Sequence, residues 1–202
     1  WIDYCEARSV PYKIVNCYRS DIIKELKDCD GLMWHWDHND YKSMLFAKQF
    51  KLALHNMGIK TFPDVNTSWH FDDKLGQKYL LEAIGAPFVP SYAFYTPSEA
   101  MDWAKVTDYP KVFKLRGGAS SVNVKLVTDA EKAFQLIRKA FSSGFRYIDR
   151  KALVMDKIHQ FQRTKSFKKF LEIMPALRRL LIPSITEKML GRQKGYIYFQ
   201  DF

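Results

Sequence analysis

The sequence predicts an α/β protein, with a small doubly wound domain at the N-terminus and a second α/β unit that carries a basic helical insertion. Three observations predict this fold class. Short β-like runs alternate with helical stretches through the first part of the chain, which is typical of parallel strands joined by crossover helices. Further strand and helix patterns follow around a loop of small residues, and positive charge is then concentrated in residues 150–194.

Five elements are expected in the N-terminal domain, residues 1–70. The β-like runs are residues 13–17, 31–36 and 61–63, and the helices are residues 21–27 and 41–57. Ser20 or Asp21 can cap the first helix, Asp40 can cap the second, and Gly58 can end it. Hydrophobic residues make up 47% of the chain, which is enough for a packed core.

Residues 71–145 read as an α+β unit. Helices are expected at residues 72–84, 97–105 and 129–140, and strands at residues 91–95, 111–115 and 122–127. Gly85 and Pro87 prevent the first of these helices from continuing. The two remaining segments are a helical insertion at residues 146–194 and a last strand at residues 195–202.

The link between the strands at residues 111–115 and 122–127 has the composition of an anion-binding loop. Its polar and flexible positions are Lys114, Gly117, Gly118, Ser120 and Ser121. Glycines let backbone N–H groups approach an anion, hydroxyls add donors, and a strand lysine adds positive charge for phosphate. The pattern fits neither a P-loop, nor a Rossmann glycine motif, nor the order of loop and lysine in protein kinases. A plain β-hairpin with a Gly-Gly turn is the alternative interpretation.

Three segments in order carry a family resemblance. They are Phe71-Asp72-Asp73-Lys74 with the later Gly85-Ala86-Pro87-Phe88-Val89-Pro90, then Lys114 with its loop, and finally Gly195-Tyr196-Ile197-Tyr198-Phe199-Gln200-Asp201-Phe202. Together they resemble the ATP-grasp family, which includes D-alanine–D-alanine ligases, glutathione synthetases and ribosomal-protein glutamate ligases. The resemblance covers about residues 60–145 and 195–202, and implies that the chain holds the N-terminal and central parts of that fold.

The resemblance implies roles at eight positions. Those on the phosphates of ATP are Lys74, Lys114, Gly118, Ser120 and Ser121, and those that border the adenine are Gln200, Asp201 and Phe202. The lysines would hold phosphate oxygens, and the loop would close over the β- and γ-phosphates. Asp201 and Phe202 would offer a backbone donor and acceptor. The family usually has glycine where this chain has Asn123, and asparagine tolerates the left-handed backbone conformation that such a turn needs.

The activity that the resemblance implies is an ATP- and magnesium-dependent ligation of a carboxylate to an amine through an acyl phosphate, on small molecules or peptides. The magnesium ligands should be hard oxygen donors and are expected after Phe202, so no metal ligand is assigned in this chain. The chain starts without methionine and ends on the expected hinge strand, so we expect a fragment that does not turn over alone. The alternatives are a nucleotide-binding protein that regulates without catalysing, and an anion-binding module based on the basic helices.

Residues 150–194 contain twelve Lys and Arg residues and three acidic residues, so the segment has a net charge of +9. The net charge of the whole chain is +10. A helical stripe of apolar residues runs through the segment: Phe167, Phe170, Leu171, Met174, Leu177 and Leu181. One interpretation is a surface for an anionic partner, either a polyanionic substrate, an acidic protein or a membrane surface. The other is a helix that packs on the body of the enzyme with a solvated basic face.

The cysteines and the hydropathy indicate a cytoplasmic location. Cys5, Cys17 and Cys29 have no paired spacing, which fits structural thiols in a reducing compartment. No apolar run approaches the ~18 residues that a membrane-spanning helix needs.

His35, Asp37 and His38 lie at the C-terminal end of the second expected strand, where ligands tend to bind in doubly wound sheets. A metal site would need a fourth ligand, and the sequence offers no evident one. The lining of a substrate pocket and plain local packing are the other two interpretations of this cluster.

Overall fold

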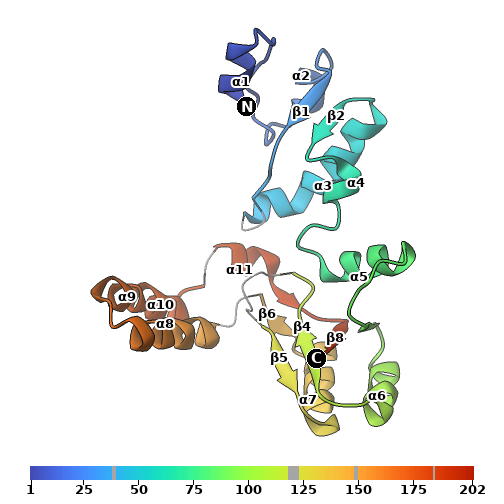
Figure 1. Cartoon of the computed structure of the whole chain (residues 1–202), viewed down its shortest axis with the longest axis vertical. Helices are drawn as coiled ribbons and strands as arrows, with labels where there is room; N and C mark the ends of the chain where they lie inside the picture. The colour runs from blue at the N-terminus through green and yellow to red at the C-terminus, as the bar shows by residue number, and fades with distance from the viewer. Residues whose placement is uncertain (38–39, 118–122, 148–149, 184) are drawn as a thin grey trace. The chain divides into compact units, whose positions relative to one another are not determined.

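The computed structural model of the chain describes residues 1–37, 40–117, 123–147, 150–183 and 185–202 (Figure 1). Residues 151–153, 156, 168, 170, 176, 179 and 181 are described by their backbone alone. The chain divides into two compact units, Trp1–Trp36 with Phe46–Asn66, and Asp37–Leu45 with Thr67–Phe202. Among the described residues, no helix is both long enough and apolar enough to cross a membrane.

The first elements of the chain build a small parallel pair of strands. In order they are α1 (Ile2–Ala7), α2 (Ile22–Glu25), β1 (Gly31–Met33), α3 (Tyr41–Asn56), β2 (Lys60–Phe62) and α4 (Val65–Ser68). Strands β1 and β2 are parallel, with Gly31 opposite Lys60, and α3 is the connection between them. The buried core of the first unit consists of Cys17, Ile22, Leu26, Leu32, Phe50, Leu54 and Ile59.

Two expectations for this region are wrong. Residues 13–17, all of which the structure describes, form no strand, and α1 was not predicted. Asn16 interrupts the extended segment, because its side chain accepts a hydrogen bond from the Tyr18 N–H at 3.0 Å and so starts a turn. The described strands of this unit therefore number two, which gives a parallel pair instead of the expected doubly wound sheet.

The second unit is built around a four-stranded antiparallel sheet. Its elements are α5 (Lys74–Ala83), β3 (Ser91–Phe94), α6 (Pro97–Val106), β4 (Lys111–Lys114), β5 (Lys125–Val127), α7 (Ala130–Phe141), β6 (Phe145–Arg146), α8 (Arg150–Thr164), α9 (Phe167–Leu171), α10 (Ile173–Leu181), α11 (Ile185–Leu190), β7 (Arg192–Gln193) and β8 (Ile197–Asp201). The strand order is β3-β8-β4-β5, so the last strand of the chain lies between β3 and β4, which are formed much earlier in the sequence, with Ser91 opposite Gln200 and Lys111 opposite Asp201.

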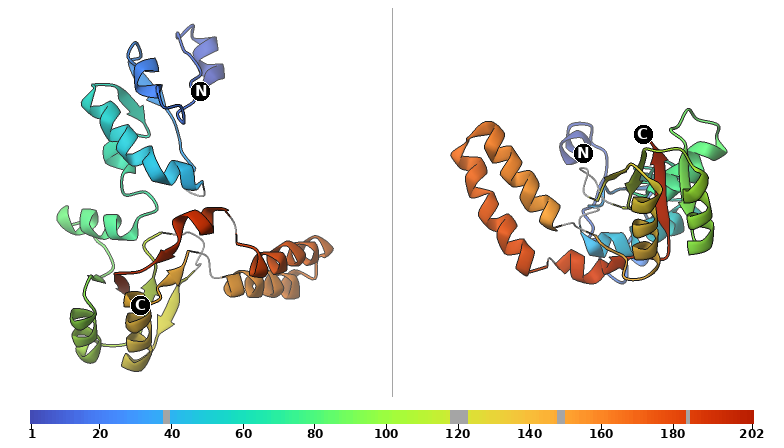
Figure 2. Two further views of the ribbon diagram at one scale, coloured as in Figure 1. Left: turned by 180° about the vertical axis from the view of Figure 1, so that it is seen from behind. Right: turned by 90° about the horizontal axis from the view of Figure 1, so that it is seen from below.

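Helices α6 and α7 pack side by side on one face of this sheet (Figure 2). Trp103 of α6 stacks on Phe199 of β8 with 5.1 Å between ring centroids, and it also contacts Tyr92 and Phe94 of β3. Phe113 of β4 and Phe199 are almost fully buried beneath these helices. This core fixes the face on which α6 and α7 lie, and leaves the opposite face of the sheet to α5.

The helices of the basic segment form a hairpin. α8 packs against α9 and α10, and the short antiparallel pair β6–β7 joins the two ends of the segment, with Phe145 opposite Gln193. Arg150 and Glu187 form a buried ion pair at 2.7 Å. The helices agree with the sequence, whereas β6 and β7 were not predicted because two-residue strands leave no periodic pattern.

Candidate functional site

The three segments that carry the family resemblance meet at one place in the second unit. The N–H of Lys74, at the start of α5, donates to the carbonyl of Arg116 at 2.8 Å. The N–H of Arg116 donates in turn to the Tyr196 hydroxyl at 2.7 Å. The Lys114 ammonium, at the end of β4, donates to Oε1 of Gln200 on β8, a residue 86 positions later in the chain. These segments follow one another along the sequence, and the structure places them in contact.

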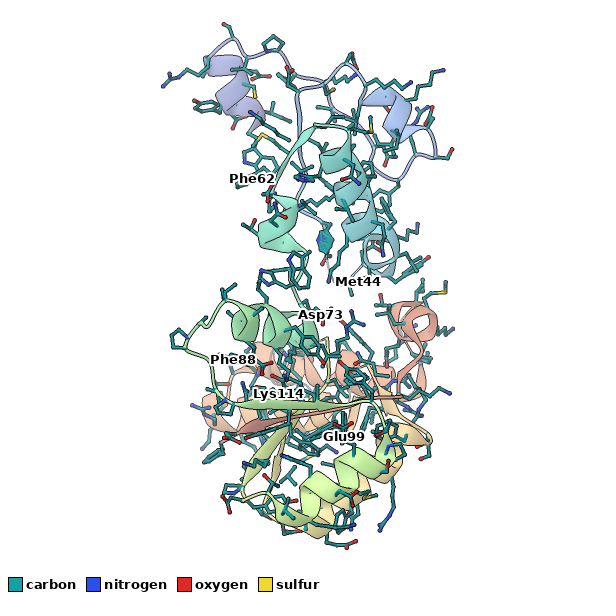
Figure 3. The ribbon with its side chains drawn as sticks, turned by 90° about the vertical axis from the view of Figure 1, so that its right-hand side faces the viewer. Met44, Phe62, Asp73, Phe88, Glu99 and Lys114 are labelled. Atoms are coloured by element: carbon teal, nitrogen blue, oxygen red, sulfur yellow. The ribbon has the colours of Figure 1, made fainter. Side chains whose placement is uncertain are left out.

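The register of the sheet decides which side chains share the face beneath α5. Lys114 lies opposite Tyr198, and Val112 lies opposite Gln200, so alternate residues of β4 and β8 point to the same face. Helix α5 reaches this part of the sheet through Tyr79, whose hydroxyl lies 2.8 Å from that of Tyr95. In Figure 3, α5 with Asp73 at its start and α6 with Glu99 lie on opposite sides of the sheet, and Lys114 is labelled between them.

Asp73 fixes the first turn of α5 to the end of β4. One carboxylate oxygen accepts the Gly76 N–H at 3.0 Å and caps the helix, as expected for an aspartate in this position. The other oxygen binds the Arg116 guanidinium at 2.6 Å. The carboxylate of Asp73 raises the pKa of Arg116, which therefore stays charged. Lys74 follows Asp73 directly, so the same contacts hold Lys74 beside the end of β4.

Lys74 and Lys114 form a partly buried pair of like charges. Burial lowers the pKa of Lys74 below its ordinary value of 10.5, and the positive charge of Lys114 lowers it further, while Asp72 and Asp73 oppose the shift. Two cations that share a partly buried position repel each other, and the two aspartates offset only part of the cost of burying the charge of Lys74. A phosphate group between the two ammonium groups would supply further negative charge.

Lys74 should give phosphate binding a defined pH dependence. Its pKa is lowered in the free chain and would rise when phosphate binds, so affinity should be constant below the free-state pKa. Above that pKa, binding must take up a proton, and affinity should fall by up to about tenfold per pH unit. Calorimetry with MgATP from about pH 7 to about pH 10, in buffers of different ionisation enthalpy, measures both effects.

The matched variant for this measurement is Lys74→Met, which should bind MgATP weakly and show no proton uptake over the same range. The folded-state pKa of Lys74 is lowered, so its charge destabilises the fold at neutral pH, and that penalty declines as pH rises from the lowered pKa to the ordinary value of 10.5. The thermal unfolding midpoint of Lys74→Met should therefore be no lower than that of the wild type. A pH-independent wild-type affinity would contradict this account of Lys74.

The two described ends of the small-residue loop are both anchored beside Tyr147. A Cβ on Gly117 would lie 3.5 Å from the Tyr147 ring and 3.6 Å from the Asp72 carbonyl. At the other end, Asn123 is buried, and its side chain donates to the carbonyls of Arg146 and Tyr147 at 3.2 and 2.9 Å. Its φ of 63° confirms the left-handed conformation expected at this position. The predicted phosphate contacts Gly118, Ser120 and Ser121 lie outside the described residues.

The side chains of the expected adenine border do not share one face. Gln200 lies with Lys114, whereas Asp201 lies opposite Lys111 and forms an ion pair with it at 2.6 Å. The Asp201 N–H donates to the Pro90 carbonyl at 2.9 Å, so this amide is engaged within the sheet and is not an open donor toward a base. In an antiparallel pair, the carbonyl of Asp201 would accept a hydrogen bond from the N–H of residue 90. Pro90 has no N–H, so the neighbouring strand offers the Asp201 carbonyl no backbone donor at this point. Phe202 follows the strand and is 83% exposed.

Comparisons with known proteins give structural neighbours and no sequence relatives. The chain matches no family model, and it matches no curated protein. It is similar to the biotin carboxylase domain of 2-oxoglutarate carboxylase from Hydrogenobacter thermophilus, bound to magnesium ADP, ADP and bicarbonate, with 14% identity and a TM-score of 0.45 over 90% of this chain and 30% of that one. It is also similar to biotin carboxylase from Campylobacter jejuni, in its β,γ-ATP complex, with 16% identity and a TM-score of 0.44 over 90% and 31%.

A third neighbour is a RimK-domain ATP-grasp protein from Sphaerobacter thermophilus, with 14% identity and a TM-score of 0.39 over 77% of this chain and 41% of that one. ATP-grasp proteins are among the neighbours of this chain, as the sequence resemblance predicts. The chain spans less than half the length of each of these proteins. Because the TM-scores are below 0.5, the functional proposal depends on the residues of the site.

Four residues of the site were not singled out from the sequence: Asp73, Lys111, Arg116 and Tyr196. Burial raises the pKa of Tyr196 to about 12, so its hydroxyl stays neutral while it accepts from Arg116 and donates to Gln193. These residues position the lysines, and their roles depend on contacts between segments at least 43 residues apart. The only local signal was the helix-capping position of Asp73.

The metal interpretation of the His35 cluster finds no support in the described part of the chain. No group of three or more His, Cys, Asp or Glu side chains that could hold a metal occurs among the described residues. His38 lies outside them. His35 and Asp37 are exposed, and each has an interaction partner.

Proposed function

We propose that this chain carries the nucleotide-binding part of an ATP- and magnesium-dependent ligase that joins a carboxylate to an amine. The observation that supports it most is the convergence of Lys74 and Lys114 at the end of β4, beside Gln200 of the last strand. A plain β-hairpin, the alternative interpretation of the loop, gives no reason for a second partly buried lysine from a helix. A phosphate site does, because two cations can share one phosphate group.

The chain's own residues would position ATP. Lys74 and Lys114 would neutralise phosphate oxygens, and the loop that follows Gly117 would cover the β- and γ-phosphates with Gly118, Ser120 and Ser121. The carbonyl of Asp201 is the backbone acceptor that we assign to the adenine, while Gln200 and Phe202 would border it. ATP supplies the phosphoryl group that activates a carboxylate for attack by an amine. Residues 71–145 would form the nucleotide-binding subdomain, with residues 146–194 as an insertion before the hinge strand at residues 195–202.

Magnesium is part of the proposal, but we assign none of its ligands to this chain. The described residues hold no cluster of carboxylates suited to the ion, and hard oxygen ligands would have to come from elsewhere in the protein. A nucleotide-binding protein that regulates without catalysing would use the same lysines. Release of ADP in the presence of a carboxylate and an amine distinguishes the two. The cytoplasmic location stays a prediction from the cysteines, all three of which are free in the structure.

The test is calorimetry of MgATP binding to the natural protein that contains this chain, with Lys114→Ala beside the wild type. We expect affinity to fall at least tenfold, about 1.4 kcal/mol, because one of the two phosphate cations is removed. Lys105→Ala is the matched control, since Lys105 is an exposed lysine on α6 that forms an ion pair with its neighbour Asp102. Equal affinity in all three proteins would move the phosphate site away from Lys114. Absence of binding by the wild type would reject the proposal.

A further inference from the structure

The helical hairpin of the basic segment exposes apolar side chains that the sequence pattern would bury. Phe167, Leu171, Met174 and Leu177, on α9 and α10, are 74%, 52%, 62% and 40% exposed. Sequence analysis left open whether this stripe packs on the body of the enzyme or meets a partner. Within the described residues, the stripe is not packed on the body. The side chains of Phe170 and Leu181, the other two members of the stripe, lie outside the described set.

The stripe points away from α8, against which this part of the chain packs. Glu172, between α9 and α10, has helical dihedral angles (φ −69°, ψ −19°), so residues 167–181 follow one helical path. At about 100° per residue, Phe167, Leu171 and Met174 fall within about 60° of one another around the axis. Glu172 lies about 140° from Phe167 and binds Lys157 of α8 at 2.8 Å, so it marks the packed side.

The charges of the hairpin leave its outer surface positive. Glu172 is neutralised by Lys157 and Lys169, and Glu187 by Arg150 in a pair that is almost fully buried. Arg163, Lys165 and Arg178 are exposed instead. Arg178 falls within the apolar stripe by the same helical spacing, one turn after Met174. An arginine there can lay its methylene groups along apolar neighbours and keep its charge at the surface.

We infer that the hairpin of α8, α9 and α10 docks on the surface of an anionic lipid bilayer, with Phe167, Leu171, Met174 and Leu177 at the boundary between headgroups and acyl chains. An exposed apolar stripe in a strongly basic segment matches both layers of that interface at once, the apolar acyl boundary and the negatively charged headgroups. A polyanion in solution would satisfy the charge but not the stripe. This inference is independent of the nucleotide site, because it uses none of its residues.

The test is sedimentation of the full chain with vesicles of phosphatidylcholine alone, or of phosphatidylcholine mixed with phosphatidylserine. The chain should bind the mixed vesicles, and salt should weaken that binding. The double variant Leu171→Ser with Met174→Ser removes apolar surface without changing charge, and it should weaken binding at least tenfold. Val106→Ser is the matched control, since Val106 is 82% exposed on α6, outside the hairpin. It should bind as the wild type does.

A second variant keeps the test valid if the first disturbs the hairpin. Arg163→Gln with Lys165→Gln alters two exposed side chains near the link between α8 and α9, and should also weaken vesicle binding about tenfold or more. Absence of binding to mixed vesicles by the wild type would overturn the inference, as would equal binding by the apolar double variant. Binding to soluble polyglutamate as tight as to vesicles, and unchanged by the apolar double variant, would identify an acidic protein partner and overturn it too.

Discussion

Asp201→Ala should lower the free energy of unfolding of the second unit by about 3 kcal/mol. Asp201 Oδ1 lies 2.6 Å from the Lys111 ammonium, and the Lys111 side chain is only 9% exposed. Without the carboxylate, the described neighbour that remains for this charge is the face of the Tyr92 ring, 5.4 Å away, which contributes about 1 kcal/mol or less. A buried cation without its partner costs more than the ion pair itself contributes.

The partner substitution Lys111→Met should lower the free energy of unfolding much less, by about 1 kcal/mol. The Asp201 side chain is 32% exposed, so water can hydrate its charge when Lys111 is removed. The double variant Lys111→Met with Asp201→Ala should therefore be close to Lys111→Met alone, so that the two effects are far from additive. Urea-induced unfolding, followed by circular dichroism and analysed for the transition of the second unit, gives all three values. Equal losses for the two single variants would contradict the assigned difference in burial.

Much of the second unit could be predicted from the sequence because its signals are local. The helices expected at residues 97–105 and 129–140 are observed as α6 (Pro97–Val106) and α7 (Ala130–Phe141), with Pro97 in the first turn of one and Asp129 as the cap of the other. A capping residue or a proline acts within a single turn, so a single sequence displays it. Residues 13–17 show the opposite case, where β-forming residues pair with none of the described strands and the side chain of Asn16 starts a turn.

The order of the strands could not be predicted, and the arrangement of the site depends on it. No local pattern shows that β8 lies between β3 and β4, because pairing of distant strands is decided by the packing of the whole unit. Register then separates neighbours in the sequence. It puts Gln200 beside Lys114 and puts the side chain of Asp201 on the opposite face, against Lys111. The sequence displays the residue types of a phosphate site but carries no local signal for the contacts that hold them.

Asp73→Ala should be the most damaging single change at the start of α5, with a loss of about 2 kcal/mol in the free energy of unfolding. The substitution removes the cap on the buried Gly76 N–H and the ion pair with Arg116 together. Gly76 has little room to shift toward another acceptor, because a Cβ at this position would lie 3.0 Å from the Trp69 ring. The first turn should fray, and Lys74 would lose its fixed place beside Lys114.

Two further variants separate the cap from the charge. Asp73→Asn keeps an oxygen that can accept from Gly76 but loses the ionic contact. Asp73→Asn should therefore cost at most about 1 kcal/mol in the free energy of unfolding. Arg116→Ala keeps the cap but leaves the Asp73 carboxylate, whose side chain is only 9% exposed, without the guanidinium, so it should cost about 2 kcal/mol. MgATP affinity should fall most in Asp73→Ala, because the capped first turn holds Lys74 next to Lys114. Thermal unfolding and calorimetry on the three variants measure both series. If Arg116→Ala weakened nucleotide binding more than Asp73→Ala did, the guanidinium itself would be a ligand for the phosphates, and the cap would have only a structural role.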